Sequence, residues 1–125
     1  MRFLVLIALF SVVVFSGCEK ETTQDEDLRV LQAMLADLNT TANSVSCDDS
    51  STWTFTAAGA KACGGPSIYI PYSTTIDTVA FLEAVQDYTD AEQDYNEKWG
   101  ISSDCQVLTA PSGVECVQGV PSMIF

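Results

Sequence analysis

The chain has 125 residues and a net charge of −12 at pH 7, with 17 acidic residues, five Lys and Arg and no histidine. This acidic excess disfavours nucleic-acid binding, because phosphate neutralisation needs clustered Lys and Arg. The missing histidine removes the commonest general base, together with every Ser-His or Cys-His catalytic arrangement. Zinc is disfavoured as well, because the sequence has no C-x-x-C pair. We therefore expect no catalytic residues, no metal and no cofactor.

The first 17 residues have the pattern of a secretion signal. Arg2 supplies a positive charge, residues 3–15 are apolar with one serine, and Ser16 and Gly17 are small, as a cleavage site requires. The apolar run is shorter than the roughly 20 residues that span a bilayer. The alternative is a buried N-terminal helix, which fits less well because a core helix shows one apolar stripe and this run is apolar on every face.

Residues Phe15 to Cys18 resemble the lipobox of bacterial lipoproteins. The resemblance implies a diacylglyceryl group on the Cys18 thiol, cleavage before that residue and acylation of the new amine, for example with palmitate. Buried acyl chains contribute about 0.8 kcal/mol per CH₂ and anchor a protein without a transmembrane helix. We expect a bacterial envelope protein that is anchored to a membrane, with its domain in the periplasm or on the cell surface. The alternative is an ordinary signal peptide, with Cys18 as a structural cysteine.

The cysteine count supports the lipid interpretation. Five cysteines are an odd number for a secreted chain, so one of them needs a separate explanation. Assigning Cys18 to lipid leaves four, which predict two disulfides in an oxidising compartment. These four are Cys47, Cys63, Cys105 and Cys116.

The pattern divides the chain into three parts. Residues 1–17 form the signal peptide, residues 18–24 are the lipidated cysteine and a short tether, and residues 25–125 form a single α+β domain. A six-residue tether reaches at most about 20 Å. The domain is therefore expected to sit close to the membrane surface.

The first predicted element of the domain is a helix from Asp25 to Asn39. Thr23 and Glu26 have the spacing of a capping box. A stripe of leucines at helical spacing marks the core face: Leu28, Leu31, Leu35 and Leu38.

Two strands follow a polar loop over residues 40–51. The first covers Thr52–Ala57 and alternates, which places Trp53, Phe55 and Ala57 on its buried face. The second covers Ile68–Tyr72. Its Pro71 cannot donate to a ladder, so we expect an edge position.

A second helix is predicted over Thr78–Trp99, with Asp77 as N-cap and Gly100 at its C-terminal end. Its core stripe consists of Phe81, Val85, Tyr88, Tyr95 and Trp99. Its solvated acidic face is expected to hold Glu83, Asp87, Asp90, Glu92, Asp94 and Glu97.

Three short strands are predicted after the second helix, over Cys105–Thr109, Val114–Val117 and Val120–Phe125, because Pro and Gly residues stand between them as turn signals. The expected fold is α+β: an N-terminal helix, two strands, a long amphipathic helix and a three-stranded C-terminal meander. The sheet is expected to be mostly antiparallel, stabilised by disulfides and covered by helices on one side.

The disulfide pairing has three possibilities. A turn at residues 111–112 would place Cys105 and Cys116 as diagonal neighbours on one sheet face. This favours Cys105–Cys116 and leaves Cys47–Cys63, and the other two pairings stay open.

Residues 63–66 read Cys-Gly-Gly-Pro. The simpler interpretation is a turn between two strands that is pinned by a disulfide, since Gly and Pro are chiefly turn residues. The functional interpretation is a rigid loop presented to a partner, because preorganised loops flanked by tyrosine lose little entropy on docking. The candidate partner-binding residues are Gly64, Gly65, Pro66, Tyr69 and Tyr72, and the acidic face of the second predicted helix is the second choice of partner surface.

A wider pattern over residues 47–125 includes this segment. It consists of Trp53, Cys63-Gly64-Gly65-Pro66, Tyr69, Tyr72, Tyr95-Asn96, Ser103-Asp104-Cys105 and Val114-Glu115-Cys116. The pattern resembles a group of small uncharacterised bacterial lipoproteins that share a CGGP segment and four domain cysteines. The resemblance implies a lipoprotein signal and a cysteine-stabilised domain, and it implies no activity.

These observations predict a membrane-anchored, non-catalytic binding or interaction module with a protein partner and no nucleic acid. The alternative is an inhibitor of a secreted hydrolase, such as a lysozyme or protease, because a stapled loop on an acidic body suits a basic enzyme. A carboxylate-based enzyme and a purely structural envelope component are weaker hypotheses. The oligomeric state stays open.

Overall fold

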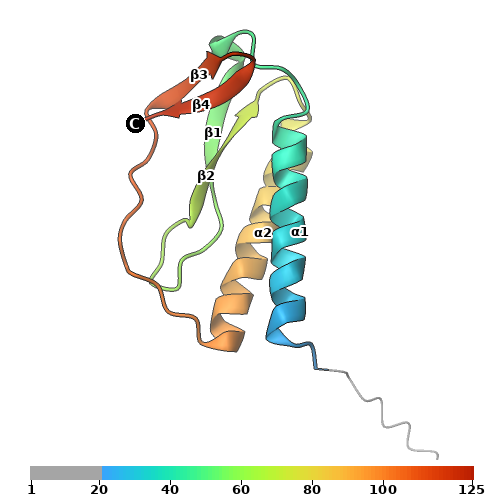
Figure 1. Cartoon of the computed structure of the whole chain (residues 1–125), viewed down its shortest axis with the longest axis vertical. Helices are drawn as coiled ribbons and strands as arrows, with labels where there is room; N and C mark the ends of the chain where they lie inside the picture. Colours follow the sequence, from blue (N-terminus) through green and yellow to red (C-terminus); the bar gives the residue numbers. More distant parts are fainter. Residues whose placement is uncertain (1–20) are drawn as a thin grey trace, which may run out of the picture.

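The computed structural model describes residues 21–125 (Figure 1). The expected signal peptide and Cys18 lie outside the described residues. The chain order is α, β-β, α, β-β, which confirms the α+β class. The elements are α1 (Gln24–Ala42), η1 (Ser50–Thr52), β1 (Trp53–Ala58), β2 (Ile68–Ser73), α2 (Thr78–Trp99), β3 (Gly113–Val117) and β4 (Val120–Ile124).

Both helices begin at the predicted caps. The Glu26 N–H donates to Thr23 Oγ1 at 3.3 Å, and the Thr23 N–H donates to the Glu26 carboxylate at 2.9 Å, which completes the capping box. The Ala80 N–H donates to Asp77 Oδ1 at 3.1 Å at the start of α2. Gly100 ends α2 in the left-handed region, with a φ of 60°. The predicted bounds of α2 are confirmed, whereas α1 runs three residues further than predicted, to Ala42.

The two helices lie side by side and antiparallel, and the β1–β2 hairpin packs along one side of the pair (Figure 1). Asp27 ties the start of α1 to the end of α2, because its carboxylate accepts from Lys98 Nζ at 2.7 Å and from Trp99 Nε1 at 3.0 Å. Burial of a large apolar side chain stabilises by about 1.5–3 kcal/mol. The main core consists of Leu31, Leu38, Ala42, Ala58, Ile70, Tyr72, Phe81, Val85 and Tyr88.

The four strands form two separate antiparallel hairpins. In the first, Trp53 lies opposite Ser73 and Ala58 lies opposite Ile68. In the second, Val117 lies opposite Val120, so that Gln118 and Gly119 form a two-residue turn. Both turn residues have positive φ, 52° and 79°, as the tight turn of a twisted hairpin requires.

A second, smaller core joins the two hairpins. It consists of Cys47, Trp53 and Val114, with Phe55 and Cys116 packed against it. The Cys47–Cys116 disulfide crosses this core and connects the segment after α1 to β3.

The β1 side chains divide between the two cores by parity. Trp53 and Phe55 face the smaller core, whereas Ala58 faces the helices. Ala57 shares the parity of Trp53 and is exposed, so its predicted burial is wrong. The β3–β4 hairpin packs at the Trp53 end of β1. It therefore covers Trp53 and Phe55 on this face of the strand and leaves Ala57 exposed.

The predicted strand over Cys105–Thr109 is wrong, because residues 101–111 carry no helix or strand. The C-terminal region is therefore a two-stranded hairpin and not a three-stranded meander. Cys105 has a φ of 54° and is bonded to Cys63, which places this stretch beside the loop between β1 and β2. A left-handed residue and a covalent tie to a loop both oppose pairing in a regular ladder.

The favoured disulfide pairing is wrong for the same reason. The protein forms Cys47–Cys116 and Cys63–Cys105, with Cα atoms 5.2 Å apart in each pair. The favoured pairing required a strand and a turn at residues 105–112 that the chain does not form. Two disulfides were predicted, and residues 21–125 contain two.

Candidate functional site

The loop between β1 and β2, residues 59–67, contains the Cys-Gly-Gly-Pro segment and is named here the CGGP loop. Its base is held by α2 through hydrogen bonds that involve Gly59 and Ala60. The Gly59 N–H donates to Thr89 Oγ1 at 2.9 Å, and the Ala60 N–H donates to Glu92 Oε2 at 2.6 Å. Asn96 Nδ2 donates to the Ala60 carbonyl at 2.7 Å. The three α2 residues recur at helical spacing, so one face of the helix fixes the loop.

Glu92 is the most connected of these helix residues. Besides the Ala60 N–H, its carboxylate accepts from Ser67 Oγ at 2.6 Å and from the Tyr88 hydroxyl at 3.4 Å. Burial raises the pKa of Tyr88, and the neighbouring negative charge of Glu92 raises it further.

The prediction that Glu92 belongs to the solvated acidic face is wrong, because the residue is half-buried against the loop. A signal for this position was present in the sequence. Val85, Tyr88 and Glu92 follow one another at spacings of three and four, so Glu92 continues the buried stripe of α2.

Gly59 allows the close approach of the loop to this carboxylate. Its φ is +72°, and an added Cβ would collide with Ser67 Oγ and Glu92 Oε2. Only glycine combines this backbone angle with the absence of a side chain. The position therefore requires glycine for both reasons.

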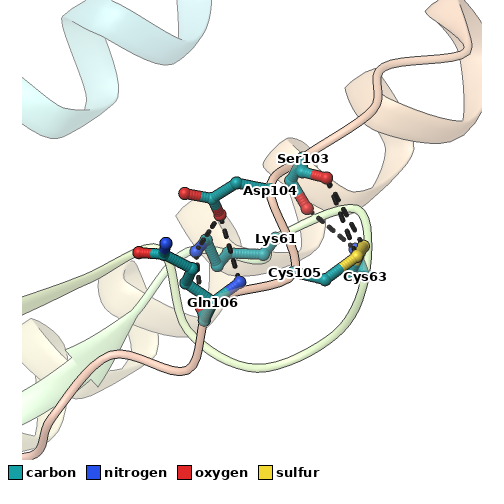
Figure 2. Close-up of a disulfide and its surroundings, with 6 residues drawn as sticks. All are labelled: Lys61, Cys63, Ser103, Asp104, Cys105 and Gln106. Carbon is teal, nitrogen blue, oxygen red and sulfur yellow. Dashed lines mark hydrogen bonds and ion pairs between the residues drawn. A yellow bond between two sulfur atoms is a disulfide. The ribbon is translucent and has the colours of Figure 1, made fainter.

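The opposite side of the CGGP loop is fastened to residues 103–106 (Figure 2). The Cys63–Cys105 disulfide makes the covalent connection. Lys61 Nζ donates to Asp104 Oδ1 at 2.8 Å and to the Gln106 carbonyl at 2.7 Å. The hydrogen bond from Lys61 holds the pKa of the Asp104 carboxyl below its ordinary value.

The tip of the loop is closed by its own backbone and stays open to solvent. The Lys61 N–H donates to the Gly65 carbonyl at 2.9 Å, and the Gly64 N–H donates to the Lys61 carbonyl at 2.8 Å. Gly64 and Gly65 are exposed, with φ values of 96° and 82°, and an added Cβ would meet nothing within 4 Å at either one. A cavity of about 500 Å³ lies between this tip and residues 105–108.

The predicted partner-binding residues do not all share this surface. Gly64 and Gly65 lie at the tip, and Pro66 is half-buried beside them. Tyr69 is half-buried on β2, with its ring edge-on to Phe55 at 6.0 Å between centroids. Tyr72 is only 9% exposed and its ring centre lies 4.9 Å from that of Phe81, so it contributes to the main core.

Within residues 21–125, no group of three Cys, Asp or Glu side chains is placed to hold a metal ion. The same part of the chain has no helix of the length and apolar character that crossing a membrane requires. No protein-family model, curated protein or solved structure matches this chain.

Proposed function

We propose that this protein is a lipid-anchored component of the bacterial envelope whose domain is a non-catalytic binding module, with the tip of the CGGP loop as its partner surface. One observation carries the proposal: the loop is rigidly held on two sides while its tip stays exposed. α2 holds the base through Glu92, and the Cys63–Cys105 disulfide holds the far side. A loop fixed before binding loses little conformational entropy when a partner docks.

The lipid anchor is supported by the pattern around Cys18 and by the pairing of the other cysteines. All four cysteines of the described residues are used in the two disulfides, which leaves Cys18 for acylation, for example with palmitate. Because α1 begins at Gln24, only a few residues separate the anchor from the domain, and they reach at most about 20 Å. The domain therefore works close to a membrane, in the periplasm or on the cell surface.

Affinity capture from native envelope extract tests the binding surface. The bait is the oxidised full chain in a non-ionic detergent, beside a variant with Ala62→Arg at the exposed side of the loop tip. The matched control is Ala33→Arg, which adds the same side chain at an exposed position of α1. We expect a protein that the wild type and the control retain and that Ala62→Arg loses. Equal capture by all three chains would remove the loop from the proposal.

Inhibition of a secreted hydrolase is the second candidate function. The net charge of −12 favours a basic enzyme as target, and a rigid exposed loop suits insertion into an active-site cleft. Titration of the oxidised chain into a lysozyme and a serine protease tests it, and unchanged rates at micromolar excess would contradict it. A carboxylate-based enzyme has less support, because the half-buried carboxylate of Glu92 is already engaged by the loop.

A further inference from the structure

A groove runs along the antiparallel helix pair and is lined by helix residues and the α2 N-cap alone. Two cavities make it up, of about 330 and 240 Å³. On α1 the lining residues recur every three to four positions from Asp27 to Thr41, and on α2 they do so from Asp77 to Lys98. At 1.5 Å per residue, the α2 side of the groove is about 30 Å long. The two cavities are therefore parts of one linear feature.

The floor of this groove is apolar and its rim is mostly acidic; the one cation among the lining residues is Lys98, which is paired with Asp27. Met34, Leu38, Phe81 and Ala84 supply much of the floor beside Asp37, Asp77 and Asp87 in the larger cavity, and Asp94 lines the smaller one. Among the described residues, none of these four aspartates forms a salt bridge; the ion pairs there are Lys61–Asp104 and Lys98–Asp27. An apolar floor between carboxylates that form no salt bridge is a surface complementary to apolar and cationic groups together, although Asp77 also caps α2.

We propose that this groove binds a cationic amphipathic helix of a partner protein. The apolar stripe of such a helix fills the floor, and its flanking Lys and Arg side chains reach the aspartates on either side. A groove of this length accommodates about five helical turns. In helix-in-groove recognition, an amphipathic helix places its apolar face in such a groove. The bound helix would pack against both α1 and α2 and form a three-helix arrangement with them.

Charge distinguishes this occupant from two others. A second copy of the chain would bring another net charge of −12 to the acidic rim, and an anionic lipid surface would be repelled in the same way. The groove shares no lining residue with the cavities at the CGGP loop. The inference therefore stands independently of the loop proposal.

The test uses a fluorescently labelled 18-residue peptide of Leu and Lys, ordered so that the leucines form one helical stripe. A scrambled peptide has the same composition and charge without the stripe. Anisotropy is measured with the oxidised full chain in a non-ionic detergent at physiological ionic strength, where long-range attraction is screened. The wild type is compared with Asp37→Asn/Asp87→Asn and with Glu83→Gln/Glu115→Gln, which removes the same charge outside the groove. Binding to micelles is common to all three chains, and a titration of each peptide with detergent alone corrects the comparison between the two peptides.

We expect the ordered peptide to bind about tenfold more tightly than the scrambled one. The Asp37→Asn/Asp87→Asn chain should lose roughly fivefold in affinity, and the control pair should stay within about twofold of wild type. Ala84→Gln, which fills the floor without changing charge, should weaken binding as well. Equal affinity for both peptides, or equal losses in both double variants, would overturn the proposal. So would a dimer in sedimentation velocity that the peptide does not dissociate, because the occupant would then be a second copy.

Discussion

The Glu92 carboxylate lies against Gly59, at the point where β1 ends and the CGGP loop begins. The missing side chain of Gly59 leaves the space that this carboxylate occupies. The Glu92 carboxylate accepts hydrogen bonds from the Ala60 N–H and the Ser67 hydroxyl in the space beside the Gly59 α-carbon. The contact cannot be deduced from Gly59 itself, since the sequence around it signals only a turn. The helical spacing of Glu92 after Tyr88 does carry the information, because it continues a buried stripe.

Replacement of Gly59 by alanine, compared with the same change at Gly64, distinguishes the energetic cost of losing the Glu92 contact from the cost of backbone strain. We expect Gly59→Ala to reduce the free energy of unfolding by about 3 kcal/mol, because the methyl group displaces Glu92 and Ser67 in addition to straining a positive φ. Gly64→Ala is the control, since it strains a similar backbone angle and meets no neighbour, and it should cost about 1 kcal/mol. Urea unfolding under oxidising conditions measures both. Equal losses would show that the Glu92 contact contributes nothing beyond backbone conformation.

Lys61 and Lys98 make a reciprocal pair of tests, because each donates to a different aspartate. The hydrogen bond from Lys61 lowers the pKa of Asp104, and the hydrogen bond from Lys98 lowers the pKa of Asp27. Lys61→Met should raise the pKa of Asp104 toward 3.8 and leave Asp27 unchanged, and Lys98→Met should do the reverse. Carboxyl titration by NMR measures both values in each chain.

The sign of the accompanying stability change follows from the direction of these shifts. A carboxyl whose pKa is lowered in the folded state stabilises the fold above its unfolded pKa. That contribution disappears as the pH falls through the lower folded value. The stability difference between the wild type and Lys61→Met should therefore shrink below pH 3.8. A difference that is independent of pH would assign the effect to packing of the lysine stem.

The helices and the C-terminal segment differ in how far local sequence determines them. The bounds of α2 are predicted correctly, because the two residues that signal its start and end, Asp77 and Gly100, directly flank the helix in the sequence. Residues 105–109 have the composition of a strand, yet a strand forms only where another strand offers a free edge. The Cys63–Cys105 disulfide places this segment beside a loop instead. No local pattern reports that pairing, so the sequence predicts a strand where none forms and favours a disulfide pairing that is wrong.

The two disulfides should open in a fixed order under mild reduction. Cys63 and Cys105 are both exposed, whereas Cys47 is only 1% exposed and belongs to the smaller core. Thiolate attack requires access to a sulfur atom, so Cys63–Cys105 should be reduced first. Brief treatment with reductant followed by alkylation and mass spectrometry identifies the labelled cysteines. The same treatment in concentrated urea should label all four together, and early labelling of Cys47 and Cys116 without urea would contradict the prediction.

Loss of the exposed disulfide should affect the element that it fastens more than the helix pair. Cys63→Ser/Cys105→Ser removes a covalent connection between residues 42 positions apart. The resulting gain in conformational entropy of the unfolded chain should lower the free energy of unfolding by about 4 kcal/mol. The main core contains neither cysteine, so α1 and α2 should keep their packing. Hydrogen exchange should show faster exchange in residues 59–67 and 101–111, with the core amides of α2 still protected. Uniform loss of protection would mean that the disulfide supports the whole domain.

At the scale of the whole molecule, the proposed lipid anchor would hold two candidate binding surfaces, the loop and the groove, near a membrane. The CGGP loop lies beside residues 103–106, and the groove follows the helix pair, so both surfaces are available on one domain. The acidic character of the chain would favour cationic partners at both surfaces. This arrangement depends on Cys18 being the attachment point, which makes the anchor the feature to test at this scale.

Cys18→Ser in the full chain tests the anchor directly. Acyl chains on Cys18 would contribute about 0.8 kcal/mol for each buried CH₂, so several chains together would hold the protein at a membrane and their loss should release it. In a bacterial host, we expect the wild type to incorporate labelled palmitate and to sediment with membranes, and the variant to lose both properties. Cys63→Ser/Cys105→Ser is the matched control, because it removes cysteines from the folded domain and should keep the label. Label that persists in Cys18→Ser would place the lipid elsewhere, and a wild type without label would contradict the proposed anchor.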